Sequence, residues 1–204
     1  MADTVLSKWS ERCSHGRMHG DTVVSVVYNH VSEMLADRGL SVVHACSNLK
    51  EIKESIECFN PVMRGESEEC TVSVLFDKDE KTAIKTMRTL LDENPSMAFL
   101  IVSADGGTPW CKKECPVTTM LQYWSAKDLM TNPTRHRIVP KHRCLEDEEV
   151  RKVLSEYSCT LDQLPGMLVT DRIARHYNFG KGDVIEIKRH GFSHEETKYY
   201  RRVV

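Results

Sequence analysis

The feature that most constrains the fold is an alternation of short apolar runs and helical stripes in the first part of the chain. Apolar runs at residues 40–45, 70–76 and 97–102 predict three strands, and the last is continuous, as in a strand buried on both faces. Helical patterns lie between these runs. Since strands that alternate with helices are joined by right-handed crossovers, the pattern predicts an α/β fold with a parallel or mixed sheet.

Local start and stop signals mark the helices of this part. Apolar positions recur at helical spacing over residues 23–35, and Gly39 supplies a C-terminal stop. A capping-box pattern predicts a second helix over residues 48–58, which Pro61 then interrupts. A third helix is expected over residues 79–91. Further expected elements are a sharp turn at 105–109, a strand at 120–124 and a short helix at 126–130.

The chain is expected to form two domains. A polar stretch with a proline at residues 131–134 is typical of a boundary. Residues 136–204 carry 13 Lys and Arg against 11 Asp and Glu, whereas the first 135 residues carry 15 against 19. We therefore predict a domain with a mixed sheet of βαβ type over residues 1–135 and a small α+β domain over 136–204. The second domain is expected to contain helices at 145–157, 160–164 and 171–177 and strands at 184–188 and 197–204.

Composition excludes several classes of protein. The 28 Lys and Arg residues nearly balance 30 Asp and Glu, a net charge of −2, which argues against a polybasic wrapper of DNA. No run of about 18 apolar residues is present, so no membrane span is expected. The first twenty residues lack the apolar core of a secretory signal. The eight cysteines are widely scattered, which favours reduced thiols over a disulfide framework.

A zinc site is one alternative that the sequence raises. Cys111 and Cys115 are spaced like one half of a ligand set, and His142 with Cys144 would supply the other half. The spacing is poor, because the two halves fall in different expected domains. Buried or surface thiols are the favoured interpretation, and a free-standing zinc adaptor stays open as an alternative.

A metal-dependent nuclease is the second alternative. Asp79 and Lys81 form an Asp-x-Lys pattern, in which the carboxylate would hold Mg²⁺ and the amine would assist water. No second acid on a preceding strand completes the clamp, and Asp79 also suits a helix cap. No nucleophile elbow and no phosphate-cradling glycine loop is present. We therefore predict no catalytic residues, no metal site and no cofactor.

Two segments have the composition of binding surfaces. Glycines at 106 and 107 are followed by Thr108, Pro109 and Trp110, then by Lys112 and Lys113, a combination that suits contact with a phosphate backbone. The alternative for this segment is a solvated loop. Arg172, Arg175, His176 and Tyr177 lie on one short expected helix, and Arg and Tyr are enriched at protein interfaces. The alternative there is a solvated helix face.

Four blocks in the last third of the chain resemble subunit 5 of eukaryotic DNA-directed RNA polymerases and its archaeal counterpart. They occur in the family's order, over about 69 residues. The blocks are His-Arg-Ile-Val-Pro-Lys-His at 136–142, Gln-Leu-Pro at 163–165 with Asp-x-x-Ala-Arg-x-Tyr at 171–177, Gly-Asp-Val-Ile-Glu-Ile-Lys-Arg at 182–189, and Tyr-Arg-Arg-Val-Val at 200–204. Asp37-Arg38-Gly39 and Thr108-Pro109 fit the N-terminal jaw domain of the eukaryotic form more faintly.

The resemblance implies a non-catalytic polymerase subunit. Its assembly domain, 136–204, would dock on the largest subunit, and its jaw domain, 1–135, would line the cleft for downstream double-stranded DNA. The DNA-facing candidates are then Thr108, Pro109, Lys112 and Lys113, and the largest-subunit candidates are Arg172, Arg175, Tyr177, Tyr200 and Arg201. The chain departs from the family pattern at Gly166 and in the turn at residues 191–196 before the last strand. Such divergence resembles a copy from a large DNA virus, which implies the host cytoplasm and the virion; a cellular copy would be nuclear.

Overall fold

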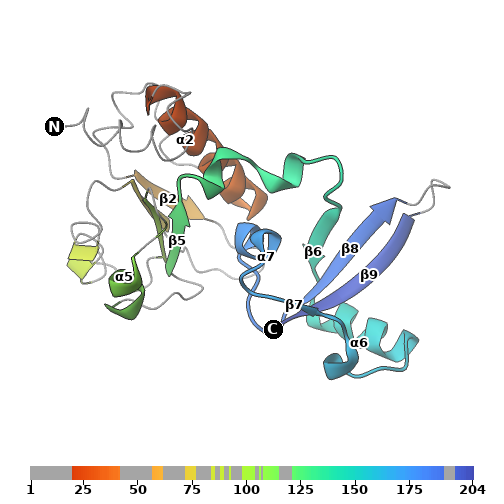
Figure 1. Ribbon diagram of the computed structural model, residues 1–204. Coiled ribbons are helices and arrows are strands. Elements are labelled where there is room, and N and C mark those ends of the chain that lie inside the picture. The colour runs from red at the N-terminus through yellow and green to blue at the C-terminus, as the bar shows by residue number, and fades with distance from the viewer. Residues whose placement is uncertain are drawn as a thin grey trace. The chain divides into compact units, whose positions relative to one another are not determined.

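The protein is described by a computed structural model (Figure 1), in which the chain divides into two compact units. We call Met1–Thr131 the N-terminal unit and Asn132–Val204 the C-terminal unit. The structure describes residues 20–41, 57–61, 72–76, 84–85, 88–89, 92, 98–103, 106, 108–114, 121–190 and 196–204. No helix in those segments is both long and apolar enough to cross a lipid bilayer.

The N-terminal unit contains a mixed five-stranded sheet, which confirms the predicted α/β class. Its strands run in the order β1-β2-β3-β4-β5. Strand β2 pairs antiparallel with β1 and with β3. Strand β4 pairs parallel with β3 on one side and with β5 on the other, as expected for βαβ connections. The strands are β1 (Leu40–Ser41), β2 (Glu57–Pro61), β3 (Val72–Phe76), β4 (Ala98–Ser103) and β5 (Leu121–Ser125).

Helix α2 (Gly20–Asp37) forms where the apolar stripe predicted it. Its members recur at intervals of three and four residues, as in 23, 27 and 31 or in 28, 31 and 35, so they share one face of the helix, and that face is buried. Gly39 ends the helix with φ +80, a conformation that favours glycine. Buried members of the stripe are Val23, Val27, Tyr28, Val31, Met34 and Leu35.

Strand β4 confirms the prediction of a strand buried on both faces, since Leu100, Ile101 and Val102 are all 1% exposed or less. Strand β5, beside it, buries a polar side chain as well. The Arg38 guanidinium donates to Oε1 of Gln122 at 2.9 Å, and the indole N–H of Trp124 donates to the same oxygen at 3.1 Å. These bonds tie the end of α2 to the sheet.

The C-terminal end of one predicted helix in this unit is wrong. A helix is expected over residues 48–58 and a break at Asn60 and Pro61, but Glu57–Pro61 forms strand β2, which pairs with β1 and β3. Local capping signals misled here because β2 is defined by partners distant in the sequence. Pro61 is tolerated because it lies beyond Phe59, the last residue of β2 that pairs with β3, and pairs with β1 alone. Residues 48–56 lie outside the described part of the chain.

Other expected elements of this unit are found with altered limits. Ile84, Lys85, Arg88 and Thr89 are helical, within the third expected helix, and Asp92, one residue beyond its expected end, is helical as well. The turn expected through Pro109 ends earlier, because α5 (Pro109–Glu114) begins there. The short helix at 126–130 is a 3₁₀ turn, η1 (Asp128–Met130). Residues 1–19 and the expected cap Asp79 fall outside the described residues.

The C-terminal unit contains a four-stranded sheet in the order β6-β8-β9-β7, in which β6 is drawn in teal and β8 and β9 in blue in Figure 1. The strands predicted at 184–188 and 197–204 are confirmed, whereas β6 and β7 were not predicted. Its strands are β6 (Lys141–Cys144), β7 (Gly166–Met167), β8 (Val184–His190) and β9 (Glu196–Val203). Its helical segments are η2 (Pro133–Arg135), α6 (Asp147–Glu156), η3 (Leu161–Gln163) and α7 (Arg172–Tyr177).

Two apolar cores lie on the two faces of this sheet. Ile185 and Ile187 of β8 point to one face and pack with Ile173 and Ala174 of α7. Val184 points to the other face and packs with Val153 of α6. Since side chains alternate along a strand, neighbouring residues of β8 and β9 serve different cores. We call these surfaces the α7 face and the α6 face.

The helices of this unit begin and end at residues with capping chemistry. The Asp171 carboxylate accepts the backbone N–H of Ile173 at 2.8 Å, as expected for the start of α7. Asn178 ends α7 with φ 58, which Asn tolerates better than most residues. Glu146 and Glu149 form a reciprocal capping box at α6, where carboxylates also suit the helix dipole.

Candidate functional site

The four DNA-facing candidates lie on and just before α5. Gly106 has φ +75, and a Cβ there would stand 3.0 Å from the backbone nitrogen of Ser125, so any other residue would be strained in this turn. Thr108 and Pro109 follow it and are exposed. Pro109 is the first residue of α5, a position that proline favours because its missing N–H is not needed.

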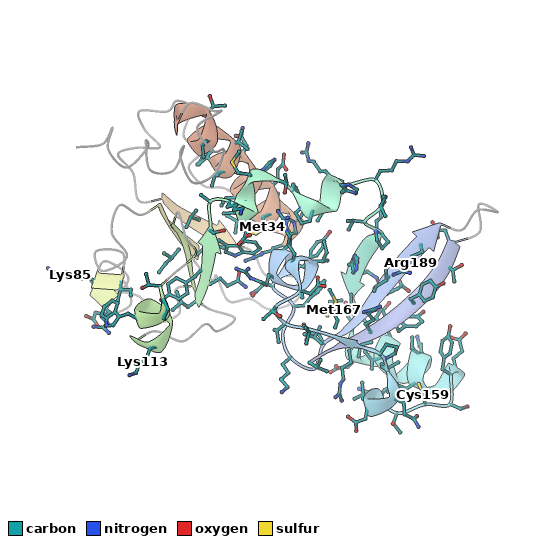
Figure 2. All side chains as sticks on the ribbon, viewed as in Figure 1. Met34, Lys85, Lys113, Cys159, Met167 and Arg189 are labelled. Atoms are coloured by element: carbon teal, nitrogen blue, oxygen red, sulfur yellow. The ribbon has the colours of Figure 1, made fainter. Side chains whose placement is uncertain are left out.

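The remaining part of this segment adds positive charge and an aromatic ring. Lys113 is exposed, and Figure 2 shows it at the end of α5. Trp110 is 46% exposed. Lys112 lies in the helix, but its side chain is outside the described set. The arrangement places a hydroxyl, an aromatic ring and a cation on one short exposed segment, which has the chemistry for phosphate contact.

The α7 candidates differ in what they do structurally. Arg172 is exposed in the first turn, whereas Arg175 is half-buried. Tyr177 packs against the core of the α7 face, and its ring stacks on Phe179 with centroids 5.3 Å apart. Tyr177 is half-buried and therefore contributes to the stability of the unit.

Tyr200 and Arg201 are both candidates for contact with the largest subunit, but they lie on opposite faces of strand β9. Tyr200 packs on the α6 face and meets the ring of Tyr157 edge-on at 5.8 Å. Arg201 is exposed on the α7 face, and its guanidinium lies 3.4 Å from the carbonyl oxygen of Gly166. Adjacent residues of a strand point to opposite faces, so these two cannot belong to one flat surface.

A buried carboxylate on the α6 face was missed by sequence reasoning. The Glu186 side chain is 4% exposed and has three cationic neighbours. Its oxygens lie 3.4 Å from Arg143, 3.5 Å from Lys198 and 3.9 Å from Lys188. No local signal distinguishes Glu186 from a surface glutamate, because these cations come from three strands.

The charged groups around Glu186 also shift the pKa values of neighbouring side chains. The bond from Arg143 to Glu149 holds the pKa of the Glu149 carboxyl below its ordinary value and raises the pKa of the Arg143 guanidinium. Burial, followed by the negative charge of Glu186, raises the pKa of the Tyr200 hydroxyl. The α6 face therefore carries a network of ion pairs around Glu186 and, beneath α6, an apolar core.

The metal alternatives gain no support from the described side chains. Within that set, no group of three or more His, Cys, Asp or Glu is arranged to hold a metal ion. Burial and the nearby Asp183 raise the pKa of the Cys144 thiol to about 11, which disfavours the thiolate that zinc requires. Cys115, Asp79 and Lys81 lie outside the described residues, as does the side chain of Cys111.

Comparison with known proteins decides the family. Residues 131–203 match the family described as RNA polymerase Rpb5, C-terminal domain. Over 80 residues the chain is 35% identical to DNA-directed RNA polymerase subunit Rpo5 of the archaeon Sulfurisphaera tokodaii, covering 39% of this chain and 95% of that protein. The chain belongs to the RNA polymerase subunit 5 family.

Eukaryotic members of the subunit 5 family match a larger share of the chain. It is 31% identical over 138 residues to DNA-directed RNA polymerases I, II, and III subunit RPABC1 of Caenorhabditis elegans, which covers 64% of this chain and 65% of that protein. It is 25% identical over 203 residues to DNA-directed RNA polymerase subunit 5-like protein 1 of Arabidopsis thaliana, covering 90% of this chain and 96% of that protein. The matched region thus spans slightly less than two thirds of the nematode relative.

Membership in the subunit 5 family confirms the resemblance carried by the four sequence blocks. All four lie in the C-terminal unit, where they build one piece of structure. The first leads into β6, the second contains α7, the third forms β8 and the fourth ends β9. The motif residues are therefore brought together by the sheet order β6-β8-β9-β7, although they are spread along the sequence.

Proposed function

We propose that this protein is a non-catalytic subunit of a multisubunit DNA-directed RNA polymerase, and that its C-terminal unit docks on the largest subunit. The observation that carries the proposal is the family match over residues 131–203, which coincides with a compact unit that has its own sheet and two cores. An archaeal polymerase subunit is matched over 95% of its length by only 39% of this chain. This supports an assembly role for one part of the chain.

We further propose that the N-terminal unit acts as a jaw beside downstream double-stranded DNA. The proposed contacts are Thr108, Pro109, Lys112 and Lys113, supported by the exposed segment at the start of α5. Such contacts would reach the phosphate backbone and carry no sequence preference. Bond formation is assigned to other subunits. A viral source, with the host cytoplasm and virion as location, stays a prediction, as does the nucleus for a cellular copy.

The assembly role is tested by purification of the polymerase from cells that produce the protein with an N-terminal affinity tag. We expect the largest polymerase subunit in the purified complex, in equal molar amount. The control is the same tagged chain with Ile185→Asp, which places a charge in the core of the α7 face. It should no longer co-purify with the largest subunit. Recovery of the tagged chain without any polymerase subunit would contradict the proposal.

The jaw role is tested in the assembled enzyme by crosslinking to downstream DNA. We expect Lys112→Ala with Lys113→Ala to weaken the crosslink and to reduce the slope of log affinity against log salt by about one for each lost phosphate contact. Lys85→Ala with Lys127→Ala is the matched control, because both lysines are exposed in the same unit. An unchanged crosslink in the first variant rejects these contacts.

A further inference from the structure

Two adjoining pockets open on the C-terminal unit, beside the segment that leads into β6. Their volumes are about 720 and 260 Å³, and both are lined by Ile138, Val139, Pro140 and Arg189. The smaller one extends over Met167 and Ile187 of the α7 face. We call the combined depression, defined by these six residues, the Ile138 groove. Arg189 lies on β8 near its end (Figure 2).

The wall of the groove exposes an aliphatic side chain that no described residue of the unit covers. Ile138 is 83% exposed, more than any other large hydrophobic residue in the described part of the chain. Its backbone is nevertheless held on both sides. The N–H of Val139 donates to the carbonyl oxygen of His136 at 2.9 Å, and Nδ1–H of His142 donates to that of Pro140 at 2.8 Å. The groove is therefore preformed, which lowers the entropic cost of binding.

Positive charge surrounds this apolar surface. Asp171 and Glu196 are the acidic side chains of the lining, and the Asp171 carboxylate is engaged as the cap of α7. Across the described segments, no carboxylate lies within ion-pair distance of Arg137, Lys141 or Arg189. The basic residues of the lining are Arg137, Lys141, Lys188, Arg189 and Arg201, of which Lys188 also lies 3.9 Å from Glu186 on the α6 face.

One of these cations is held in place. The Arg189 guanidinium lies 5.0 Å from the centroid of the Tyr199 ring, which is itself 47% exposed. A cation over an aromatic face keeps its outward N–H groups available, and the planar fork suits a carboxylate. The groove thus combines an aliphatic wall with an oriented donor, rather than charge alone.

We propose that the Ile138 groove binds an extended, acidic segment of a neighbouring polymerase subunit, with an apolar side chain of that segment against Ile138 and carboxylates toward Arg189 and Arg201. The inference rests on the proposed function, because the partner is a polymerase subunit. A nucleic acid fits less well, since bases stack on aromatic rings and phosphates need no aliphatic wall. Apolar anchoring with complementary charge at the rim is typical of protein interfaces.

The test places a photo-crosslinking residue in the full chain within the assembled polymerase. Ile138→p-benzoylphenylalanine probes the groove, and Leu168→p-benzoylphenylalanine is the control, because Leu168 is aliphatic, 64% exposed and outside the lining. We expect a product at position 138 that maps to a polypeptide segment rich in Asp and Glu. Position 168 should not give that product.

Charge reversal then tests the cationic rim. Arg189→Glu with Arg201→Glu should lower the crosslink yield at position 138 about tenfold, because two attractions become repulsions. Arg151→Glu with Lys152→Glu, both exposed on α6, should leave the yield unchanged. The subunit composition of each preparation is measured alongside.

The outcomes separate the two proposals. The groove proposal is overturned by any of three results at position 138: a product with nucleic acid, a product with a segment that lacks acidic residues, or no product. In each of these cases, a co-purified largest subunit still upholds the proposed function. Equal yields from the two charge-reversal variants also overturn the groove proposal. A preparation without polymerase subunits overturns the proposed function, and the groove inference is rejected with it.

Discussion

Gln122 in the N-terminal unit and Glu186 in the C-terminal unit are both buried polar residues within a sheet, and they are satisfied by different means. Gln122 is neutral, and one oxygen accepts two directional bonds, from Arg38 and from the indole of Trp124. Glu186 is a carboxylate with cations at 3.4–3.9 Å, each roughly half-exposed. The first arrangement depends on geometry and the second on charge.

This difference predicts how each unit responds to its surroundings. Hydrogen bonds to a buried amide change little with ionic strength, whereas attraction from half-exposed cations is screened by salt. The two units can be followed separately. All three tryptophans lie in the N-terminal unit, so their fluorescence reports its unfolding, and amide exchange in β8 reports the C-terminal unit.

The largest effect is expected for Glu186→Gln. The change removes the negative charge at nearly constant shape and leaves three cations facing one another. We expect a loss of about 2 kcal/mol in the unfolding free energy of the C-terminal unit, less than the ~3–5 kcal/mol of a fully buried pair because these cations can be rehydrated. Amide exchange in β8 measures it. The loss should shrink at about 0.5 M salt, and a salt-independent loss would contradict the charge-based account.

Gln122→Met is expected to cost slightly less, about 1–2 kcal/mol in the N-terminal unit. Methionine is close to glutamine in volume but lacks the oxygen, so the buried indole N–H of Trp124 loses its partner. Denaturant unfolding followed by tryptophan fluorescence measures the loss. In contrast to Glu186, the loss should be the same at low and high salt. A strong salt dependence would remove the distinction between the two units.

The contrast also explains what the sequence could predict. Asp171 before α7, Gly39 after α2 and the apolar run of β4 act through residues within a few positions, and their elements were predicted correctly. Strand β2 and the setting of Glu186 depend on strands distant in the sequence. Local pattern reasoning has no access to such partners.

The candidate site follows the same division. The resemblance located the family blocks, and their family is confirmed by the comparisons. It did not reveal that Tyr200 and Arg201 point to opposite faces, although strand alternation alone predicts this for neighbours. The Ile138 groove was missed because its lining comes from the segment before β6, from β7 and from β8, which meet only in the folded sheet.

The third prediction tests Asp171, a carboxylate of the C-terminal unit that stabilises α7 through a directional hydrogen bond. Asp171→Ala removes the acceptor for the Ile173 N–H at the start of α7, and we expect a loss of about 1 kcal/mol in the C-terminal unit. Asp171→Asn, which keeps an acceptor oxygen, should restore most of it. Exchange of the α7 and β8 amides gives both values. If Asn is as damaging as Ala, charge rather than the hydrogen bond is responsible.

The smallest effect is expected for His142, on the α7 face of the sheet that carries Glu186 on its other face. Burial lowers the pKa of the His142 ring below its ordinary value, and Arg189 and Arg201 act in the same direction, against Asp171 and the bond to Pro140. The folded state therefore favours the neutral ring. Since the unfolded chain then binds more protons, this contribution is present above pH ~6.5 and is lost as the pH falls below that value.

We therefore expect the C-terminal unit to be slightly less stable at about pH 5.5 than at about pH 7.5, and His142→Gln to reduce this difference. The effect is small because the ring is only half-buried. Amide exchange in β8, corrected for the intrinsic pH dependence of exchange, measures it at both pH values. An identical pH dependence in the variant would assign the change to other groups, and the α7 face would then not respond to protonation of His142.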